Sequence, residues 1–212
     1  MRVLIAGANG KIGQHLVRLM AASPHTARAM VRKPEQAAAL EKLGAAETVV
    51  GDLEQDCTHA LKDCDAVVFT AGSGPHTGPE KTIDVDQDGA IRLIDSARAA
   101  GVKRFLMVSS MRADRPENAP EKLHHYLRAK HKADEHLRAS GLDFTLVRPG
   151  PLTNDPGTGK VELAARLDRT GSIPREDVAA VLLATLDADN SIHQSFDLLS
   201  GDYGIAESLS RL

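Results

Sequence analysis

Three glycines near the start of the chain have the spacing of a phosphate-binding loop. Gly7, Gly10 and Gly13 follow an apolar run over residues 3–6 and open a segment with apolar side chains at helical spacing. A strand that turns through glycines into a helix directs backbone N–H groups and the positive end of the helix dipole at one point. Glycine is needed because a Cβ would hold an anion away from the backbone or crowd the helix against the strand. This stretch therefore predicts a site for a phosphate or a pyrophosphate.

Two charged residues lie where such a nucleotide site would continue. Arg32 follows a predicted second strand at 27–31, where an NAD-binding site often carries an acid for the ribose 2′-hydroxyl. A guanidinium there offers two N–H groups to a 2′-phosphate, so we expect NADP(H) to be favoured, with NAD(H) as the alternative cofactor. Asp52 follows a third strand at 47–50. It is placed either to accept a hydrogen bond from the adenine amino group or to cap the next helix.

The rest of the chain alternates between strands and helices. This alternation predicts an α/β fold: a Rossmann-like doubly wound parallel sheet with helices on both faces, whose ligands bind at the carboxyl ends of the strands. Further strands are expected at 66–70, 104–108, 143–147 and 194–199, and helices at 34–43, up to about 100, 121–140, 174–186 and 205–209.

The pattern resembles the short-chain dehydrogenase/reductase superfamily. Besides the glycines, the resemblance rests on Gly51-Asp-Leu53, Val108-Ser-Ser110, Tyr126-x-x-x-Lys130 and Arg148-Pro-Gly150, and it spans at least residues 1–153. Within the superfamily the chain is most similar to small atypical NAD(P)-binding proteins described as epimerase/dehydratase-like. These proteins also resemble flavin and biliverdin-IXβ reductases.

The resemblance implies a catalytic role for three residues. Tyr126 would exchange a proton with the substrate oxygen, Lys130 would hold the nicotinamide ribose, and Ser110 would hydrogen-bond the developing oxyanion, with Ser109 as the alternative donor. Tyr126 and Lys130 lie four residues apart and so share a helix face. A nearby ammonium favours the phenolate of a tyrosine whose ordinary pKa is about 10. Because many atypical members have lost this pair, a role limited to holding the cofactor or the structure is the alternative.

The resemblance also implies a cofactor site and an activity. The residues expected to contact the cofactor are Gly7, Asn9, Gly10, Lys11, Ile12, Gly13, Arg32, Asp52, Leu53, Ala71, Gly72, Ser109, Lys130, Pro149, Gly150 and Leu152. We expect an NADP(H)-dependent oxidoreductase that reduces a small carbonyl, quinone or flavin-like acceptor. The alternative is a non-catalytic NADP(H)-binding redox sensor or regulatory protein. A nucleotide-sugar epimerase or dehydratase is less favoured, because members with that activity use a larger C-terminal domain than the stretch after Gly150 provides.

Three other patterns imitate known sites. The acids at 84, 86, 88 and 95 imitate a calcium loop, but the last is Asp and not Glu, and residues 72–79 cannot supply the entering helix. Four histidines at 124, 125, 131 and 136 lack the spacing of a zinc site. The run 157–160 is no phosphate loop, because Val161 stands where a magnesium-binding Ser or Thr belongs. We therefore expect no metal.

The composition of the chain limits its domain organisation, its partners and its location. A chain of 212 residues with 42% hydrophobic and 26% charged residues is typical of one globular domain, 1–212, in which residues after about 150 complete a small substrate pocket. A net charge of −3 gives no reason to expect nucleic acid or a membrane as partner, which leaves a small-molecule substrate. Two cysteines and a chain that enters its first strand at once favour the cytoplasm. The oligomeric state stays open.

Overall fold

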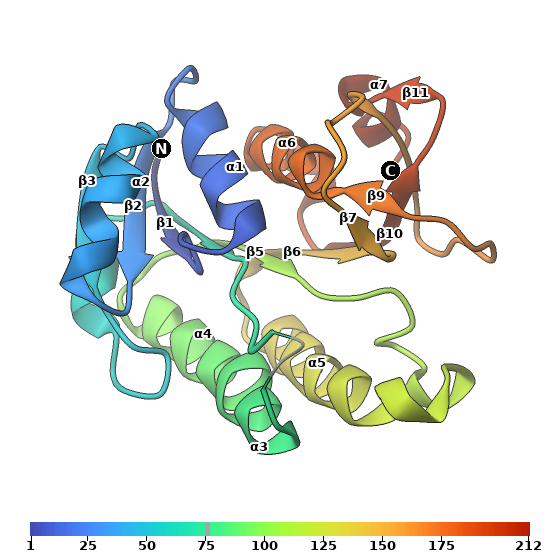
Figure 1. Ribbon diagram of the computed structural model, residues 1–212, viewed down its shortest axis with the longest axis horizontal. Coiled ribbons are helices and arrows are strands. Elements are labelled where there is room, and N and C mark those ends of the chain that lie inside the picture. The colour runs from blue at the N-terminus through green and yellow to red at the C-terminus, as the bar shows by residue number, and fades with distance from the viewer. Residues whose placement is uncertain (75–76) are drawn as a thin grey trace.

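A nine-stranded sheet forms the centre of the molecule in the computed structural model, which describes residues 1–74 and 77–212. Within these residues the strand order is β11-β8-β10-β6-β5-β4-β1-β2-β3, and β7 pairs with β9 in a separate small sheet (Figure 1). Pro75 and His76, part of the glycine-rich stretch expected not to be helical, lie outside the described residues. The strands are β1 Arg2–Ala6, β2 Thr26–Val31, β3 Glu47–Val50, β4 Ala66–Phe69, β5 Arg104–Val108, β6 Asp143–Pro149, β7 Leu152–Thr153, β8 Lys160–Ala164, β9 Ile173–Pro174, β10 Gln194–Ser200 and β11 Tyr203–Gly204.

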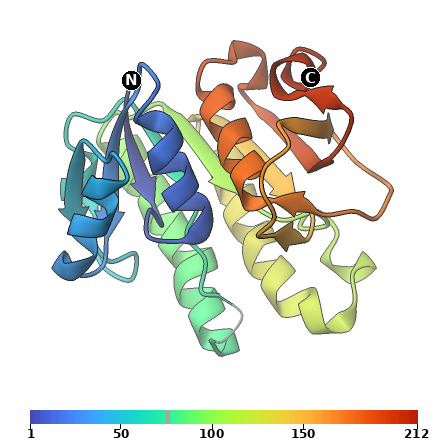
Figure 2. The same cartoon turned by 45° about the horizontal axis from the view of Figure 1, so that its top comes forward.

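Helices cover both faces of this sheet. In Figure 1, α1 and α6 lie on one face and α4 and α5 on the other, and Figure 2 shows α1 beside α6. The buried side chains accordingly form two hydrophobic clusters, one on each side of the strands. The α-helices are α1 Lys11–Met20, α2 Ala37–Lys42, α3 Pro79–Thr82, α4 Ala90–Ala99, α5 Glu121–Ala139, α6 Arg175–Leu186 and α7 Ile205–Leu209. Short 3₁₀ turns occupy Pro34–Gln36, Thr58–Leu61, Pro116–Asn118 and Asp189–Ser191. No helix in the described part of the chain is long and apolar enough to cross a membrane.

Parallel pairing brings the carboxyl ends of the central strands into one row. Ala6 of β1 lies opposite Phe69 of β4, Phe69 opposite Met107 of β5, and Val108 of β5 opposite Val147 of β6. The strand order reverses between β1 and β4, and a reversal of this kind opens a crevice for ligands. The predicted doubly wound α/β sheet is thus confirmed, and its ligand edge carries the residues that directly follow these strands.

The end of the sheet beyond β10 differs from the prediction of a purely parallel sheet. β8 pairs antiparallel with both β10 and β11. Only Val161 of β8 is buried, so the strand lacks the run of apolar residues that predicts the central strands. The partners of β8 are about 35 residues further along the chain, and that pairing depends on tertiary contacts.

The long helix expected up to about residue 100 is interrupted by a π-helical segment, Ile83–Gly89, between α3 and α4. Three of the acids that imitate a calcium loop, those at 84, 86 and 88, lie in this segment, and Asp95 lies in α4. Asp86 is buried, with only 1% of its surface exposed. The predicted assignment of these acids to the beginning of a helix is confirmed. A π-helical turn often marks a functional site because the inserted residue redirects a side chain.

Arg104 at the start of β5 attaches the C-terminal part of the chain to the sheet. Its guanidinium donates to the backbone oxygens of Asp143 (2.7 Å) and Thr185 (3.0 Å) and to Oγ of Ser191 (2.9 Å). Burial lowers the pKa of this arginine to about 10, partly opposed by Asp143 and Asp189. One side chain therefore joins β5 and β6 to the end of α6.

Replacing this arginine should loosen the C-terminal part. Arg104→Met keeps the aliphatic bulk but leaves buried acceptors unsatisfied, and should lower the free energy of unfolding by about 2–4 kcal/mol in urea denaturation. Arg98→Met is the control, because Arg98 is exposed on α4 and should change stability by less than about 0.5 kcal/mol. Equal stability of the two variants would contradict the attachment.

Candidate functional site

The first and third glycines are needed to pack the loop between β1 and α1. Gly7 has φ of +90°, and a Cβ there would lie 2.5 Å from the backbone nitrogen of Ala71, just beyond β4. A Cβ on Gly13 would lie 2.3 Å from the carbonyl oxygen of Gly7 and 2.7 Å from Cα of Ala8. These distances are too short for any side chain, so Gly7 lets the loop fold tightly against the end of β4, and Gly13 lets the start of α1 pack against the loop itself.

Gly10 has a different role from its two neighbours. Its backbone angles suit any residue, and a Cβ there would contact only the carbonyl oxygen of Gly7, at 3.2 Å. Gly10 is the N-cap of α1 and supplies no side-chain cap, so the first N–H groups of the helix have no partner within it. The absence of a side chain leaves these groups open to an anion, and the loop therefore fits a pyrophosphate.

The loop residues between the glycines present mainly their backbone. Ile12 is buried in the core on one side of the sheet, and Asn9 accepts a hydrogen bond from Nε2 of Gln14 (2.9 Å) through its carbonyl oxygen. Lys11 is exposed, and its Nζ donates to Oδ1 of Asn154 (3.2 Å), just after β7. The segment with Leu152 thus lies next to the glycine loop, as the prediction of a shared cofactor site requires.

Three predicted contacts lie at the far end of this edge. Arg32 is exposed after β2, and its backbone N–H donates to Oε1 of Gln36 (3.0 Å). Asp52 is half-buried, and its Oδ1 accepts from the N–H of Glu54 (3.1 Å), so it caps a turn and not the helix considered in the sequence analysis. Leu53 is buried against Gly89, whose Cβ would lie 3.0 Å from Cβ of Leu53.

Asp86 connects the end of β4 with α5, and the sequence analysis did not assign it to the site. Its Oδ2 accepts from the N–H of Ser73 (2.9 Å), and a Cβ on Gly72 would lie 3.1 Å from its Oδ1. The same Oδ1 is 3.7 Å from Nζ of Lys130. The π-helical segment aims this carboxylate inward, which helical periodicity does not predict.

Lys130 is buried, with 2% of its surface exposed, and lies at the centre of these contacts. Its Nζ is 5.9 Å from the ring centroid of Phe69, the last residue of β4. Burial alone would lower the pKa of this lysine, but the charge of Tyr126 when it is ionised and the carboxylates of Asp86 and Asp134 outweigh it, and the pKa of Lys130 lies above its ordinary value. Lys130 is therefore a permanent cation at the carboxyl end of β4.

Tyr126 is half-buried one turn before Lys130, on the same face of α5. Burial raises the pKa of its hydroxyl, although the charge of Lys130 and a hydrogen bond with Ser110 both lower it. The expectation that the surroundings of Tyr126 favour its phenolate is thus wrong, because the net shift of its pKa is upward. The lysine acts in the predicted direction, but the loss of solvation is larger, and Tyr126 holds its proton at neutral pH.

Ser109 and Ser110 face in different directions after β5. The hydroxyl of Ser109 is buried and donates to Oδ2 of Asp134 (2.8 Å), and its N–H donates to the carbonyl oxygen of Val147 (2.8 Å). The hydroxyl of Ser109 already donates its hydrogen to Asp134, so it is not free to donate to the cofactor or to an oxyanion. Ser110 is half-buried next to Tyr126 and is the serine that the structure brings to the predicted pair.

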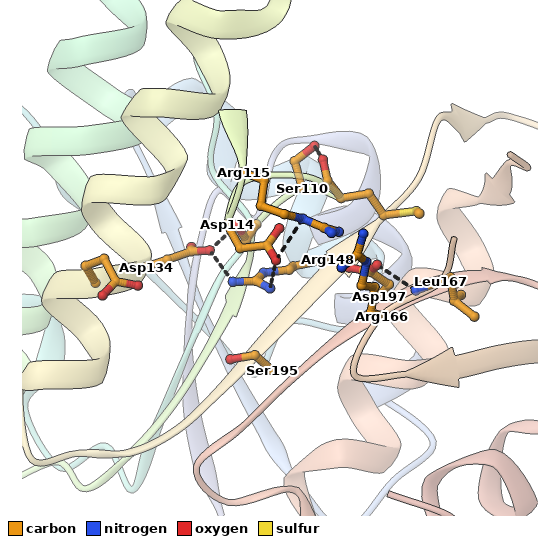
Figure 3. Close-up of polar contacts among 12 residues, drawn as sticks. Ser110, Asp114, Arg115, Asp134, Arg148, Arg166, Leu167, Ser195 and Asp197 are labelled. Carbon is orange, nitrogen blue, oxygen red and sulfur yellow. Dashed lines mark hydrogen bonds and ion pairs between the residues drawn. The ribbon is translucent and has the colours of Figure 1, made fainter. Parts of the chain in front are cut away.

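A buried charge network lies behind these serines. Figure 3 shows Arg148 of β6 between Asp134 of α5 and Asp114 of the loop after β5, at 3.5 and 3.8 Å. Burial raises the pKa of Asp134, opposed by Arg148 and Ser109. A buried arginine needs carboxylate partners, so the Arg148-Pro-Gly150 motif was a signal for such a network, but its partners are distant in sequence.

Pro149 and Gly150 form the floor of the same edge. Gly150 donates its N–H to the carbonyl oxygen of Leu198 (3.1 Å), and a Cβ there would lie 2.4 Å from Cδ2 of Leu199 and 3.1 Å from Sδ of Met111. This glycine is thus packed closely against the ends of two flexible side chains. Any cofactor contact it makes uses its backbone.

The patterns set aside in the sequence analysis do not form sites in the described residues. No group of three or more His, Cys, Asp or Glu residues there could hold a metal ion. In the run 157–160, Asp177 accepts hydrogen bonds from the N–H groups of Thr158 (3.0 Å) and Gly159 (2.9 Å). These N–H groups are already bound to a carboxylate and are not free for a phosphate.

Comparisons with known proteins agree with this geometry. Residues 7–189 match a family described as NAD(P)H-binding. An uncharacterized sugar epimerase of Bacillus subtilis, YhfK, is 51% identical over the full length of both chains. A solved structure from Bacillus halodurans, provisionally described as an NAD-dependent epimerase/dehydratase, is 46% identical over both whole chains with a TM-score of 0.98. The anaerobilin reductase ChuY of Escherichia coli O157:H7 is 25% identical, with a TM-score of 0.82 over 96% of this chain and 98% of that chain.

The different roles of the glycines give a direct test. Gly10→Ala should leave the free energy of unfolding within about 1 kcal/mol, because its backbone and surroundings tolerate a Cβ, but weaken NADPH binding at least about tenfold. Gly13→Ala should instead destabilise the fold by about 2–4 kcal/mol through overpacking. Urea denaturation and NADPH fluorescence titration measure both quantities. Unchanged NADPH affinity in Gly10→Ala would contradict a pyrophosphate at this loop.

Proposed function

The chain belongs to the NAD(P)H-binding family, and we propose that it is an NADP(H)-dependent reductase of a small carbonyl, quinone or flavin-like acceptor. The observation that carries the proposal is the placement of Tyr126, Lys130 and Ser110 together, on the sheet edge that also holds the glycine loop. A protein that only binds the cofactor has no need of a protonated tyrosine beside a buried ammonium and a serine. The name of the E. coli relative, an anaerobilin reductase, supports the same reaction class.

The cofactor would be held along the carboxyl ends of the strands. The glycine loop would hold its pyrophosphate through backbone N–H groups, and Lys130 would hold the ribose next to the reacting end. When bound, NADPH supplies a hydride equivalent. Asp86 keeps Lys130 in place, because the carboxylate lies 3.7 Å from Nζ and is itself held by the N–H of Ser73.

Tyr126 would supply the proton that a carbonyl oxygen needs on reduction. Because burial keeps the pKa of Tyr126 above its ordinary value, the hydroxyl is protonated at neutral pH and acts as a general acid. Ser110 would donate a second hydrogen bond to the developing oxyanion. As the proton leaves Tyr126, the ammonium of Lys130 stabilises the phenolate that forms.

Arg32 is the basis for preferring NADP(H). It is exposed directly after β2, and no described carboxylate pairs with its guanidinium. A fork of N–H donors that lacks an acidic partner suits a 2′-phosphate better than a 2′-hydroxyl.

Cofactor preference tests the Arg32 assignment. The parent protein should bind NADPH more tightly than NADH, and Arg32→Ala should weaken NADPH binding by about tenfold while leaving NADH binding unchanged, because only the 2′-phosphate is lost as a partner. Isothermal titration calorimetry measures both affinities, with Arg98→Ala as a charge-matched control. Equal affinities of the parent protein for NADPH and NADH would refute the assignment.

Turnover tests the function itself. NADPH oxidation should be measured with aldehydes, ketones, quinones and flavins, and Tyr126→Phe should lower turnover of a carbonyl acceptor by at least about 10²-fold with NADPH affinity intact. Tyr203→Phe, which changes the other tyrosine, should have no effect, because Tyr203 is exposed and stacks on Arg211. Since the reaction needs protonated Tyr126, turnover should fall only as the pH rises above about 10, and this alkaline fall should disappear in Tyr126→Phe.

The alternatives give different results. A flavin or quinone takes its proton from solvent, so normal turnover of such an acceptor by Tyr126→Phe would show that hydride transfer alone is used. No turnover with any acceptor, together with partner binding that depends on the oxidation state of the cofactor, would favour the redox sensor.

A further inference from the structure

A cavity of about 170 Å³ lies beside the reacting end of the site, and we propose that it binds an anionic oxygen group, a carboxylate or a phosphate, on the acceptor molecule. The inference rests on the proposed function, because it names the class of acceptor that the reductase would take. Met111 lines the cavity and directly follows Ser110. The opposite wall comes from residues 167–170 and from Asp197 of β10. An acceptor whose reacting carbon lies near Ser110 would thus extend into this cavity.

Two of the three arginines that line the cavity have donors to spare. Arg169 is committed, since it donates to Oε2 of Glu162 (2.8 Å) and to the carbonyl oxygen of Ser200 (2.8 Å). Arg115 is half-buried, and its Nε is buried 3.4 Å from Oδ2 of Asp114, so the terminal Nη groups, for which no hydrogen bond is found among the described residues, are the donors left for a ligand (Figure 3). Arg112 forms no ion pair with any described residue.

The carboxylates of the cavity are already compensated. Asp168 accepts from Nε of Arg166 (2.6 Å), and Asp197 accepts from the N–H of Leu167 (2.9 Å). Burial raises the pKa of Asp197, and the N–H of Leu167 and the charge of Arg148 oppose this shift. The donors of Arg112 and Arg115 are therefore left for a ligand, and guanidinium groups bind carboxylates and phosphates with paired hydrogen bonds.

The backbone of the loop is strained at Arg112. Among the described residues, three that are not glycine have a positive φ, namely Asp63, Arg112 (68°) and His193. Asp and His are residue types that tolerate this region, whereas a long side chain such as arginine is rarely found there. The turn is held by hydrogen bonds from the N–H of Ala113 to Ser110 and from the N–H of Arg115 to Arg112. Strain that the surroundings maintain in this way is typical of a functional loop.

Arg148 fixes this loop to the catalytic helix. Its Nη1 lies 3.8 Å from Asp114 of the loop and its Nη2 lies 3.5 Å from Asp134 of α5, four residues after Lys130 (Figure 3). The cavity lies on the β10 side of the central strands, whereas Arg32 follows β2 on the other side of β1. The arginines of the cavity therefore serve the acceptor and not the 2′-phosphate of the cofactor.

Binding of small charged ligands tests the cavity without any turnover. The protein saturated with NADP⁺, which occupies the cofactor's own phosphate sites, is titrated calorimetrically with phthalate, phenyl phosphate and neutral dimethyl phthalate. Phthalate or phenyl phosphate should bind at least about tenfold more tightly than the neutral ester. The ligand that binds shows whether the cavity takes a carboxylate or a phosphate. Arg112→Asn and Arg115→Gln should each weaken that binding about tenfold, whereas Arg98→Gln should not. Asparagine is chosen because it tolerates the positive φ and so preserves the turn.

The outcomes separate this inference from the proposed function. The subsite would be overturned if the charged ligands bind no better than the ester, or if Arg112→Asn and Arg115→Gln leave their binding unchanged. Either result would hold against it even if the enzyme reduces neutral acceptors. Arginine-dependent binding of a charged ligand would support the subsite even if no acceptor in the screen is turned over. With an active enzyme, the KM for 4-carboxybenzaldehyde should be at least about tenfold below that for methyl 4-formylbenzoate, and Arg112→Asn should remove the difference.

Discussion

The full burial of Lys130 is the constraint on which the site depends. A buried ammonium is costly unless carboxylates surround it, and the fold supplies Asp86 from the π-helical segment and Asp134 from the next turn of α5. Asp134 is itself buried and needs a cation, which Arg148 of β6 provides. These pairs tie α5 to the ends of β4 and β6. Because α5 also carries Tyr126, the position of the tyrosine hydroxyl follows from the same set of buried charges.

A second constraint is steric and not electrostatic. Gly7 lets the first loop approach the end of β4, and Gly13 lets α1 approach the loop, so closely that no side chain fits at either position. Gly150 also packs closely, in this case against the side chains of Leu199 and Met111. The backbone at this edge of the sheet is thus closely packed on the strands below it. Backbone N–H groups that are fixed in this way bind an anion without an additional ordering cost.

Burial and charge act on Tyr126 in opposite directions, and this balance defines its chemistry. The ammonium of Lys130 and the hydroxyl of Ser110 favour the phenolate, but the loss of water around the ring favours the neutral phenol. The outcome is a tyrosine that keeps its proton in the resting protein and lies next to a cation that stabilises the product of proton transfer. This combination suits a general acid better than a base.

The sequence by itself determined the features that depend on neighbouring residues. The apolar runs of the central strands, the helical spacing around Ile12 and Leu16, and the three glycines were sufficient for the doubly wound sheet and for the glycine turn between β1 and α1, because local periodicity and local sterics control them. The tertiary structure decided the features that join distant residues. Asp86 enters the site through an irregular helical turn, β8 pairs with a strand far along the chain, and Ser109 turns inward because Asp134 accepts the hydrogen bond of its hydroxyl. Solvation is also a property of the whole fold, so only the structure shows that burial outweighs the lysine at Tyr126.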